Sequence, residues 1–164
     1  MKKHDILGVF LALVLFQSCT KTEYFEIGEQ NNLSLSASQN IQTEFENELF
    51  DLVNEHRLSI GLNELQFEIT SYQQASEHND YMISMGQISH THFDTRAENI
   101  SNKTGATEVS ENVAKDYNSP EEAFTAWLGS QKHRINLEGD FTHSALNVKA
   151  NSKGDLYFTQ IFIR

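Results

Sequence analysis

The sequence predicts an α+β domain, an α-β-α sandwich in which a central antiparallel sheet is flanked by helices. Three observations favour this fold class: amphipathic helical segments come first, an apolar β-hairpin comes last, and no repeat or β-α-β alternation lies between them. With 164 residues, of which 38% are hydrophobic, the chain can form one core and an additional address segment. We expect the folded domain to cover residues 44–164.

The address segment is predicted from the first 43 residues. Lys2 and Lys3 precede an apolar run over residues 6–16, which is shorter than the roughly 20 residues that a membrane-spanning helix needs but suits a secretory signal. The run ends just before Cys19, which stands where a bacterial lipoprotein signal is cut and its cysteine acylated. The alternative is an ordinary secretory signal with an incidental cysteine. We predict a signal over 1–18, and an acylated Cys19 with a polar tether over 19–43.

The predicted location is the cell envelope, with the domain lipid-anchored outside the cytoplasm. Thr20 stands where an Asp marks inner-membrane retention in some bacteria, which favours the outer membrane over the inner one. The formal net charge of −11 repels phosphate backbones, so nucleic acid is not expected as a partner. Cys19 is the only cysteine, so the domain has no thiol for a disulfide or a nucleophile.

Helical periodicity indicates three helices. Apolar residues recur at helical spacing from Phe45 to Ile60 and stop at Gly61, and a second such stretch runs over 70–85 before Gly86. The third helix begins with Ser119 as N-cap and Pro120 at the first helical position. Its inner face is formed by Phe124, Trp127, Leu128 and Gln131.

The C-terminal segment predicts a β-hairpin. Apolar side chains alternate over 146–150, a turn is expected over 151–154, and both faces of the following segment, 156–163, are apolar. A strand that is apolar on both faces is typical of the centre of a covered sheet. Residues 108–114 are expected to form a further strand or strand-like loop, with an extended piece near Leu65 and Phe67.

The histidines divide into two groups. His56 and His78 lie on the apolar stripes of the first two helices, which favours packing roles, and His133 and Arg134 are expected to satisfy carbonyls at a helix end. His90 lies in a short polar segment after the second helix, Glu111 lies on the strand or strand-like loop expected over 108–114, and His143 precedes the hairpin. Serines adjoin these three residues, but a serine next to a histidine in sequence is not a catalytic triad. These serines are Ser89, Ser110 and Ser144.

The order of several short motifs resembles the CAP superfamily of cysteine-rich secretory, antigen-5-like and pathogenesis-related 1 proteins, in its bacterial cysteine-free branch. The resemblance covers about residues 44–164 and implies the same α-β-α sandwich. The matching segments are Val53-Asn54-Glu55-His56-Arg57 with Gly61-Leu62, His90-Thr91, Glu111-Asn112-Val113-Ala114, Trp127-Leu128 with Ser130, His133 and Arg134, Phe141-Thr142-His143, and Tyr157 with Thr159, Gln160 and Phe162.

The resemblance implies a cleft with a His, Glu, Glu, His tetrad that holds a divalent cation in some members. By position, His90, Glu111 and His143 match three of the four residues, and Gln131 stands at the position of the second Glu. Two imidazoles and a carboxylate would form a three-ligand zinc site with an open position for water. Without metal, Glu111 could act as a general base, or the residues could form a buried structural network.

Two functions from different classes follow from this resemblance. The first is a binding module for a lipid, sterol-like, glycan or protein ligand at the envelope, and the second is a divalent-metal-assisted hydrolase acting on peptide or cell-wall substrates. The absent second Glu favours the binding module. Whether the protein is an enzyme stays open at this point.

Overall fold

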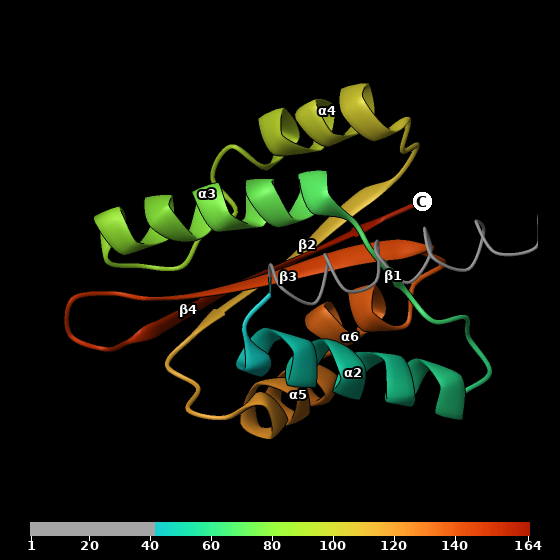
Figure 1. The fold of residues 1–164 in the computed structure, drawn as a ribbon, viewed down its shortest axis with the longest axis horizontal. Coiled ribbons are helices and arrows are strands. Elements are labelled where there is room, and N and C mark those ends of the chain that lie inside the picture. The colour runs from blue at the N-terminus through green and yellow to red at the C-terminus, as the bar shows by residue number, and fades with distance from the viewer. Residues whose placement is uncertain (1–41) are drawn as a thin grey trace, which may run out of the picture.

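The computed structural model describes residues 42–164, which form five helices and one four-stranded sheet (Figure 1). The predicted signal, the anchor Cys19 and all but the end of the tether lie outside the described residues. In chain order the elements are α2 (Glu44–Ser59), β1 (Gln66–Phe67), α3 (Ile69–Met85), α4 (Phe93–Thr104), β2 (Val109–Lys115), α5 (Pro120–Gly129), α6 (Gln131–Leu137), β3 (His143–Ala150) and β4 (Leu156–Ile163).

The sheet has the strand order β1-β3-β4-β2. β3 and β4 form the predicted hairpin, and β2 pairs antiparallel with β4, whereas the two-residue β1 runs parallel to β3. β4 is therefore central, and its residues are buried almost throughout, as the two apolar faces of its sequence predict. β2 is an edge strand, and this position is what makes its side chains available to the site described below.

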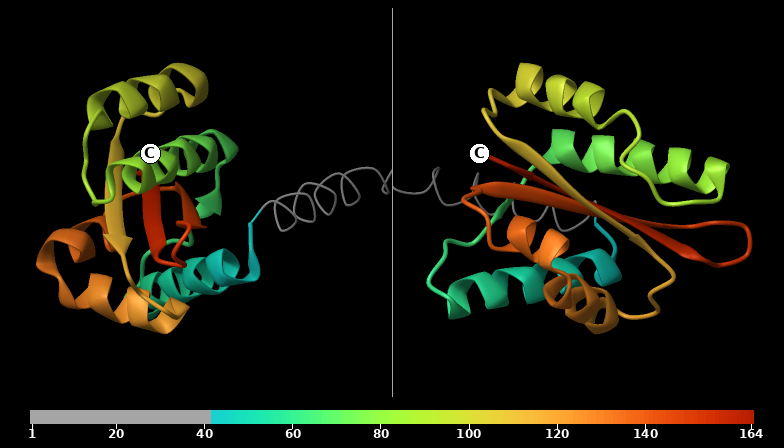
Figure 2. Two further views of the ribbon diagram at one scale, coloured as in Figure 1. Left: turned by 90° about the vertical axis from the view of Figure 1, so that its left-hand side faces the viewer. Right: turned by 180° about the vertical axis from the view of Figure 1, so that it is seen from behind.

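Helices cover both faces of the sheet, so the predicted sandwich is confirmed (Figure 2). α3 and α4 lie on one face, and α2, α5 and α6 lie on the other. The larger core cluster lies under α2 and α5, where Trp127 contacts Phe158 edge-on, and a smaller one beneath α3 and α4 contains Ile100 and Ile161. The two faces of β4 thus anchor two separate apolar layers.

The helix boundaries follow the capping signals where such signals exist. α2 begins with a capping box between Thr43 and Glu46, α5 begins after Ser119 with Pro120 in its first turn, and α3 ends at Gly86 in the left-handed conformation. The third predicted helix is divided, because Ser130 has extended backbone angles (φ −93°, ψ 116°). Gln131 consequently begins the separate helix α6.

The open edge of β3 is capped by the start of α2. Beyond its short pairing with β1, β3 has no neighbouring strand on that side within the described residues. The buried carboxylate of Glu46 accepts the amide N–H of Val148 at 2.6 Å, and Gln42 Nε2 donates to the carbonyl of Leu146 at 3.3 Å. Side chains therefore replace the missing strand and close this edge.

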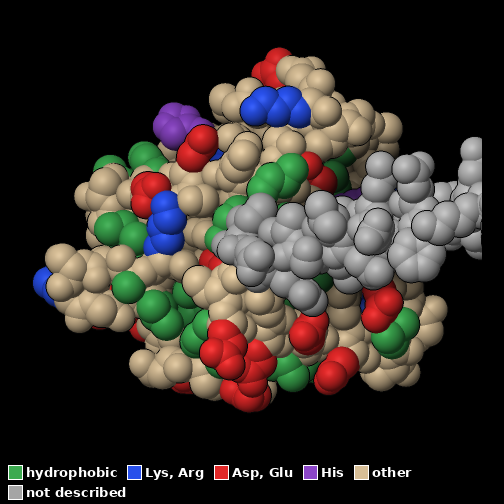
Figure 3. All heavy atoms as spheres, in the orientation of Figure 1, with side chains coloured by type: hydrophobic (Ala, Val, Ile, Leu, Met, Phe, Trp, Pro, Cys, Tyr) green, Lys and Arg blue, Asp and Glu red, His purple; other side chains and the backbone are tan. Residues whose placement is uncertain are grey.

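The acidic charge gathers on the helical face formed by α2 (Figure 3). Glu44, Glu48, Asp51 and Glu55 line a shallow hollow there, and Figure 3 shows carboxylates grouped over this part of the surface. Within residues 42–164, no helix combines the length and the apolar character needed to cross a bilayer.

Candidate functional site

The centre of the candidate site is the carboxylate of Glu111 on edge strand β2. Its side chain is 1% exposed. Arg96, on α4, donates from Nε to Oε2 at 3.0 Å and from Nη2 to Oε1 at 2.8 Å. This two-point ion pair compensates a buried negative charge and fixes the plane of the carboxylate.

His90 forms a further hydrogen bond to this carboxylate, from the side that faces solvent. Its Nδ1 lies 2.9 Å from Glu111 Oε1, and its side chain is 56% exposed. Because an ionised carboxylate only accepts hydrogen bonds, Nδ1 carries the proton, and the lone pair of Nε2 faces outward. Glu111 thus holds the ring of His90 in one orientation and one tautomer.

His78 supports the segment that carries His90. It is 2% exposed, and its Nε2 donates to the carbonyl of Ser89 at 2.6 Å, with Glu111 Oε1 at 3.8 Å. Burial lowers the pKa of His78, against an opposing attraction from Glu111. The packing role predicted for His78 is therefore confirmed, and that packing lies directly under the site.

His133, on α6, approaches the same strand from the other face of the sheet. Asn112 Nδ2 donates to the backbone carbonyl of His133 at 3.1 Å, and successive residues Glu111 and Asn112 point to opposite faces. The pKa of His133 is lowered, first by burial and then by the neighbouring charge of His90. The two imidazoles thus flank edge strand β2, with His133 neutral at pH 7.

The role predicted for His133 is wrong, whereas that of Arg134 is confirmed. The side chain of His133 contacts no carbonyl among the described residues; instead its ring lies 6.4 Å from that of Trp127. Arg134 Nη1 does donate to a helix-end carbonyl, that of Leu128, at 3.3 Å. The ring of His133, on the separate helix α6, therefore packs near a side chain of α5 and does not cap that helix.

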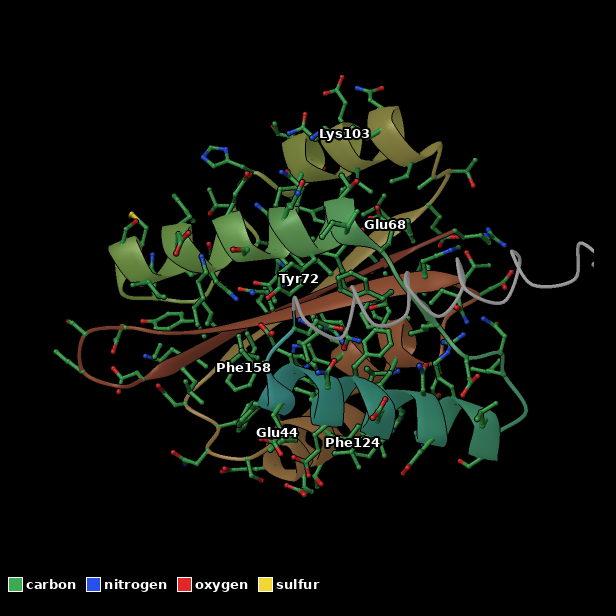
Figure 4. All side chains as sticks on the ribbon, viewed as in Figure 1. Glu44, Glu68, Tyr72, Lys103, Phe124 and Phe158 are labelled. Atoms are coloured by element: carbon green, nitrogen blue, oxygen red, sulfur yellow. The ribbon has the colours of Figure 1, made fainter. Side chains whose placement is uncertain are left out.

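His143 and Gln131 are not brought to Glu111, which corrects the predicted grouping. His143 of β3 pairs with Ile163 of β4, and Glu111 of β2 pairs with Ile161 of the same strand. β4 therefore lies between β3 and β2, and two strand spacings put the backbones of these two strands about 10 Å apart. His143 instead lines a separate hollow of about 380 Å³. Glu68 and Lys103, which Figure 4 labels, line the same hollow. Gln131 is exposed at the first position of α6.

The predicted three-ligand zinc site does not fit this arrangement. Within residues 42–164 no group of three or more His, Cys, Asp and Glu side chains is arranged to hold a metal ion. Both oxygens of Glu111 already accept hydrogen bonds from the guanidinium of Arg96, whose positive charge opposes a second cation. Because His78 Nε2 is bonded to the carbonyl of Ser89, the other imidazoles that flank strand β2 are those of His90 and His133.

Comparison with known proteins agrees with the fold and with the motif order. The model of the cysteine-rich secretory protein family, CAP, matches residues 50–162. The chain belongs to the CAP family. The matched range includes every residue of the Glu111 site.

Relatives of this CAP domain occur in bacteria. The uncharacterized protein YkwD of Bacillus subtilis (strain 168) is 32% identical over 143 residues, which cover 82% of this chain and 52% of YkwD. The uncharacterized membrane protein YlbC of the same organism is 28% identical over 137 residues, or 76% of this chain and 36% of YlbC. The chain therefore spans about half or less of the length of these curated relatives.

Solved structures share the CAP fold. An extracellular protein containing an SCP domain from Bacillus anthracis aligns with a TM-score of 0.63 and 28% identity, over 73% of this chain and 40% of that one. An outer surface protein from Borrelia burgdorferi aligns with a TM-score of 0.65 and 20% identity, over 74% of this chain and 96% of that one. The first likeness supports an extracellular type of protein, and the second shows the fold.

Proposed function

We propose that this CAP domain is a ligand-binding module of the cell envelope, and that His90 and His133 contact the ligand. The observation that carries the proposal is the orientation of His90 by a buried, fully paired Glu111. Because the hydrogen bond to Glu111 already restricts the exposed imidazole to one orientation, less side-chain entropy is lost when a ligand binds to it. His133 adds a second, neutral imidazole on the opposite side of strand β2.

We further propose that the module is lipid-anchored through Cys19, outside the cytoplasm. Support comes from the signal-like start of the sequence and from the extracellular SCP-domain relative. Expression of the full chain and of Cys19→Ser in a bacterial host, followed by membrane fractionation and mass analysis, tests this. The acyl mass and the membrane association should both disappear in Cys19→Ser; membrane association that persists in the variant contradicts an anchor at Cys19.

The binding proposal can be tested through Trp127, the only tryptophan, because its ring lies 6.4 Å from His133. The fluorescence of the full chain is titrated with tri-N-acetylchitotriose, with phosphatidylglycerol vesicles and with an N-acetylated peptide mixture. We expect a saturable change with one of these probes, its loss in His90→Ala, and its retention in His92→Asn. His92 is the control because it is exposed and its ring contacts Tyr81, and asparagine tolerates the left-handed backbone at this position.

Hydrolysis is the competing outcome of the same experiment. Glu111 would have to release its bonds to Arg96 and His90 before it could accept a proton from water, so the geometry favours binding over catalysis. Each probe is therefore analysed for cleavage after incubation. Turnover by the parent chain that is lost in Glu111→Gln, or the absence of a saturable change with every probe, overturns the binding proposal.

A further inference from the structure

Three buried polar atoms beneath α6 have no hydrogen-bond partner within residues 42–164. They are Nε1 of Trp127, Nδ1 of His133 and Oε1 of Gln160. Trp127 and Gln160 are fully buried, and native proteins pair nearly all such groups with protein or ordered water. Because a buried donor or acceptor without a partner loses its hydration and gains nothing in return, a partner is expected.

The contacts of the surrounding residues place the three side chains on the same face of the sheet. The rings of Trp127 and His133 are 6.4 Å apart. Gln160 lies directly opposite Asn112 in the sheet, and Asn112 in turn donates to the carbonyl of His133. Trp127 also contacts Phe158, which precedes Gln160 by two residues and therefore points to the same face of β4.

The donor and acceptor roles of the three atoms indicate which small molecule could bind all of them. The indole Nε1 of Trp127 can only donate. Gln160 Nε2 donates to Ser144 Oγ at 3.2 Å, which leaves Oε1 as an acceptor. A single water satisfies all three atoms if it accepts from Trp127 and donates to Gln160 and to His133 Nδ1. His133 Nδ1 is then an acceptor, and the ring proton lies on Nε2.

The two histidines then have opposite tautomers. His90 carries its proton on Nδ1, against Glu111, and presents the lone pair of Nε2. We infer that His133 carries its proton on Nε2, set by a buried water held by Trp127 and Gln160. The pair therefore presents one acceptor and one donor to a ligand. This inference rests on the proposed binding function, because it names the ligand class for the same two residues.

The ligand class that matches is a neutral group that both donates and accepts, namely a hydroxyl or a secondary amide, as in an N-acetylated sugar. A carboxylate or phosphate has no proton to give to His90, and the net charge of −11 repels it. An ammonium group has no acceptor for the N–H of His133. Trp127 and Gln160 are positioning residues in this account, since they act through His133.

The test is nuclear magnetic resonance of the full chain labelled with ¹⁵N in its histidines, at pH 7.5. We expect His90 to be protonated at Nδ1 and His133 at Nε2, with a long-lived water contacting the Trp127 indole N–H. Trp127→Phe removes the donor but keeps a ring, and it should leave His133 with mixed tautomers while circular dichroism stays unchanged. Protonation of His133 at Nδ1 in the parent chain overturns the inference without any variant.

Ligand selectivity supplies an independent readout. N-methylacetamide, which donates and accepts, is compared with N,N-dimethylacetamide, which only accepts, and the secondary amide should perturb the signals of both histidines at least tenfold more strongly at equal concentration. An equal or stronger perturbation by the tertiary amide overturns the assigned ligand class. If the tautomers are as inferred but a probe is hydrolysed, the proposed function as a binding module fails while the tautomer assignment stands.

Discussion

Arg96 donates two hydrogen bonds to the two carboxylate oxygens of Glu111, at 3.0 and 2.8 Å, and so joins α4 to edge strand β2. The two residues are fifteen positions apart, and both are almost fully buried. Arg96 also donates from Nη1 to the carbonyl of Thr91 at 2.7 Å, in the segment that carries His90. One guanidinium thus holds the carboxylate and the loop beside it.

Replacement of Arg96 should therefore destabilise the domain strongly. Arg96→Met leaves the Glu111 carboxylate buried without its cation, and removing one partner of a buried ion pair costs about 3–5 kcal/mol. Urea unfolding followed by circular dichroism measures the change in free energy. Lys103→Met, on the exposed surface of the same helix, is the matched control and should change stability by about 0.5 kcal/mol or less. Equal effects of the two substitutions would contradict this assignment.

Glu46 should be far more important for stability than Glu48 on the same helix. The oxygens of the buried Glu46 carboxylate accept the amide N–H groups of Thr43, at 2.7 Å, and Val148, at 2.6 Å. Glu46→Gln has one acceptor oxygen for these two donors and should cost about 1–3 kcal/mol. Glu48→Gln, which is exposed, should be nearly neutral when the two variants are compared by urea unfolding. A neutral Glu46→Gln would show that this edge of β3 is not closed by Glu46.

The stability of the domain should fall as the pH is lowered, because His78 is buried in its neutral form. Its folded-state pKa lies below the ordinary value of 6.5, so the unfolded chain binds more protons in that range. The stabilisation is complete above about pH 6.5 and is lost as the pH falls toward the lowered pKa. His78→Gln keeps a donor for Ser89 but cannot titrate, so its melting temperature should vary less between pH 7.5 and 5.5. Identical pH slopes would contradict this prediction.

The affinity of the protein for zinc should not depend on His143. Calorimetric titration of the full chain with zinc chloride is compared among the parent, His90→Ala and His143→Ala. Because β4 separates His143 from Glu111, we expect His143→Ala to match the parent, and any loss of affinity to follow His90→Ala. A zinc affinity that both substitutions abolish would restore the ligand set first predicted from the sequence.

The elements with local signals could be predicted from the sequence, and those without could not. Ser119, Pro120 and Gly86 mark helix ends by their own chemistry, and the apolar alternation of β3 and β4 marks the hairpin. α4 was not predicted, because it begins after His92 in a left-handed conformation with no capping side chain and buries only Arg96 and Ile100. The break at Ser130 was equally hidden, since the helical pattern continues across it.

The site could be predicted only in part for a similar reason. Glu111 and His90 were identified by motif order, and the structure places them 2.9 Å apart. Arg96 was missed because a single arginine on a polar helix gives no sign of a partner fifteen residues away. The sequence does not show whether His133 or His143 lies near Glu111, because both follow it in the chain. Strand order decides this: β4 lies between His143 and Glu111, whereas His133 on α6 contacts β2.

The orientation of His90 by Glu111 is the central claim, and the ¹⁵N spectrum of the His90 ring tests it most directly. At pH 7.5 and above, the account predicts a proton fixed on Nδ1 in the parent chain and mixed tautomers in Glu111→Gln, with the signals of His92 unchanged. A His90 ring in the parent chain that carries its proton on Nε2, or that averages between the two tautomers, would contradict the claim.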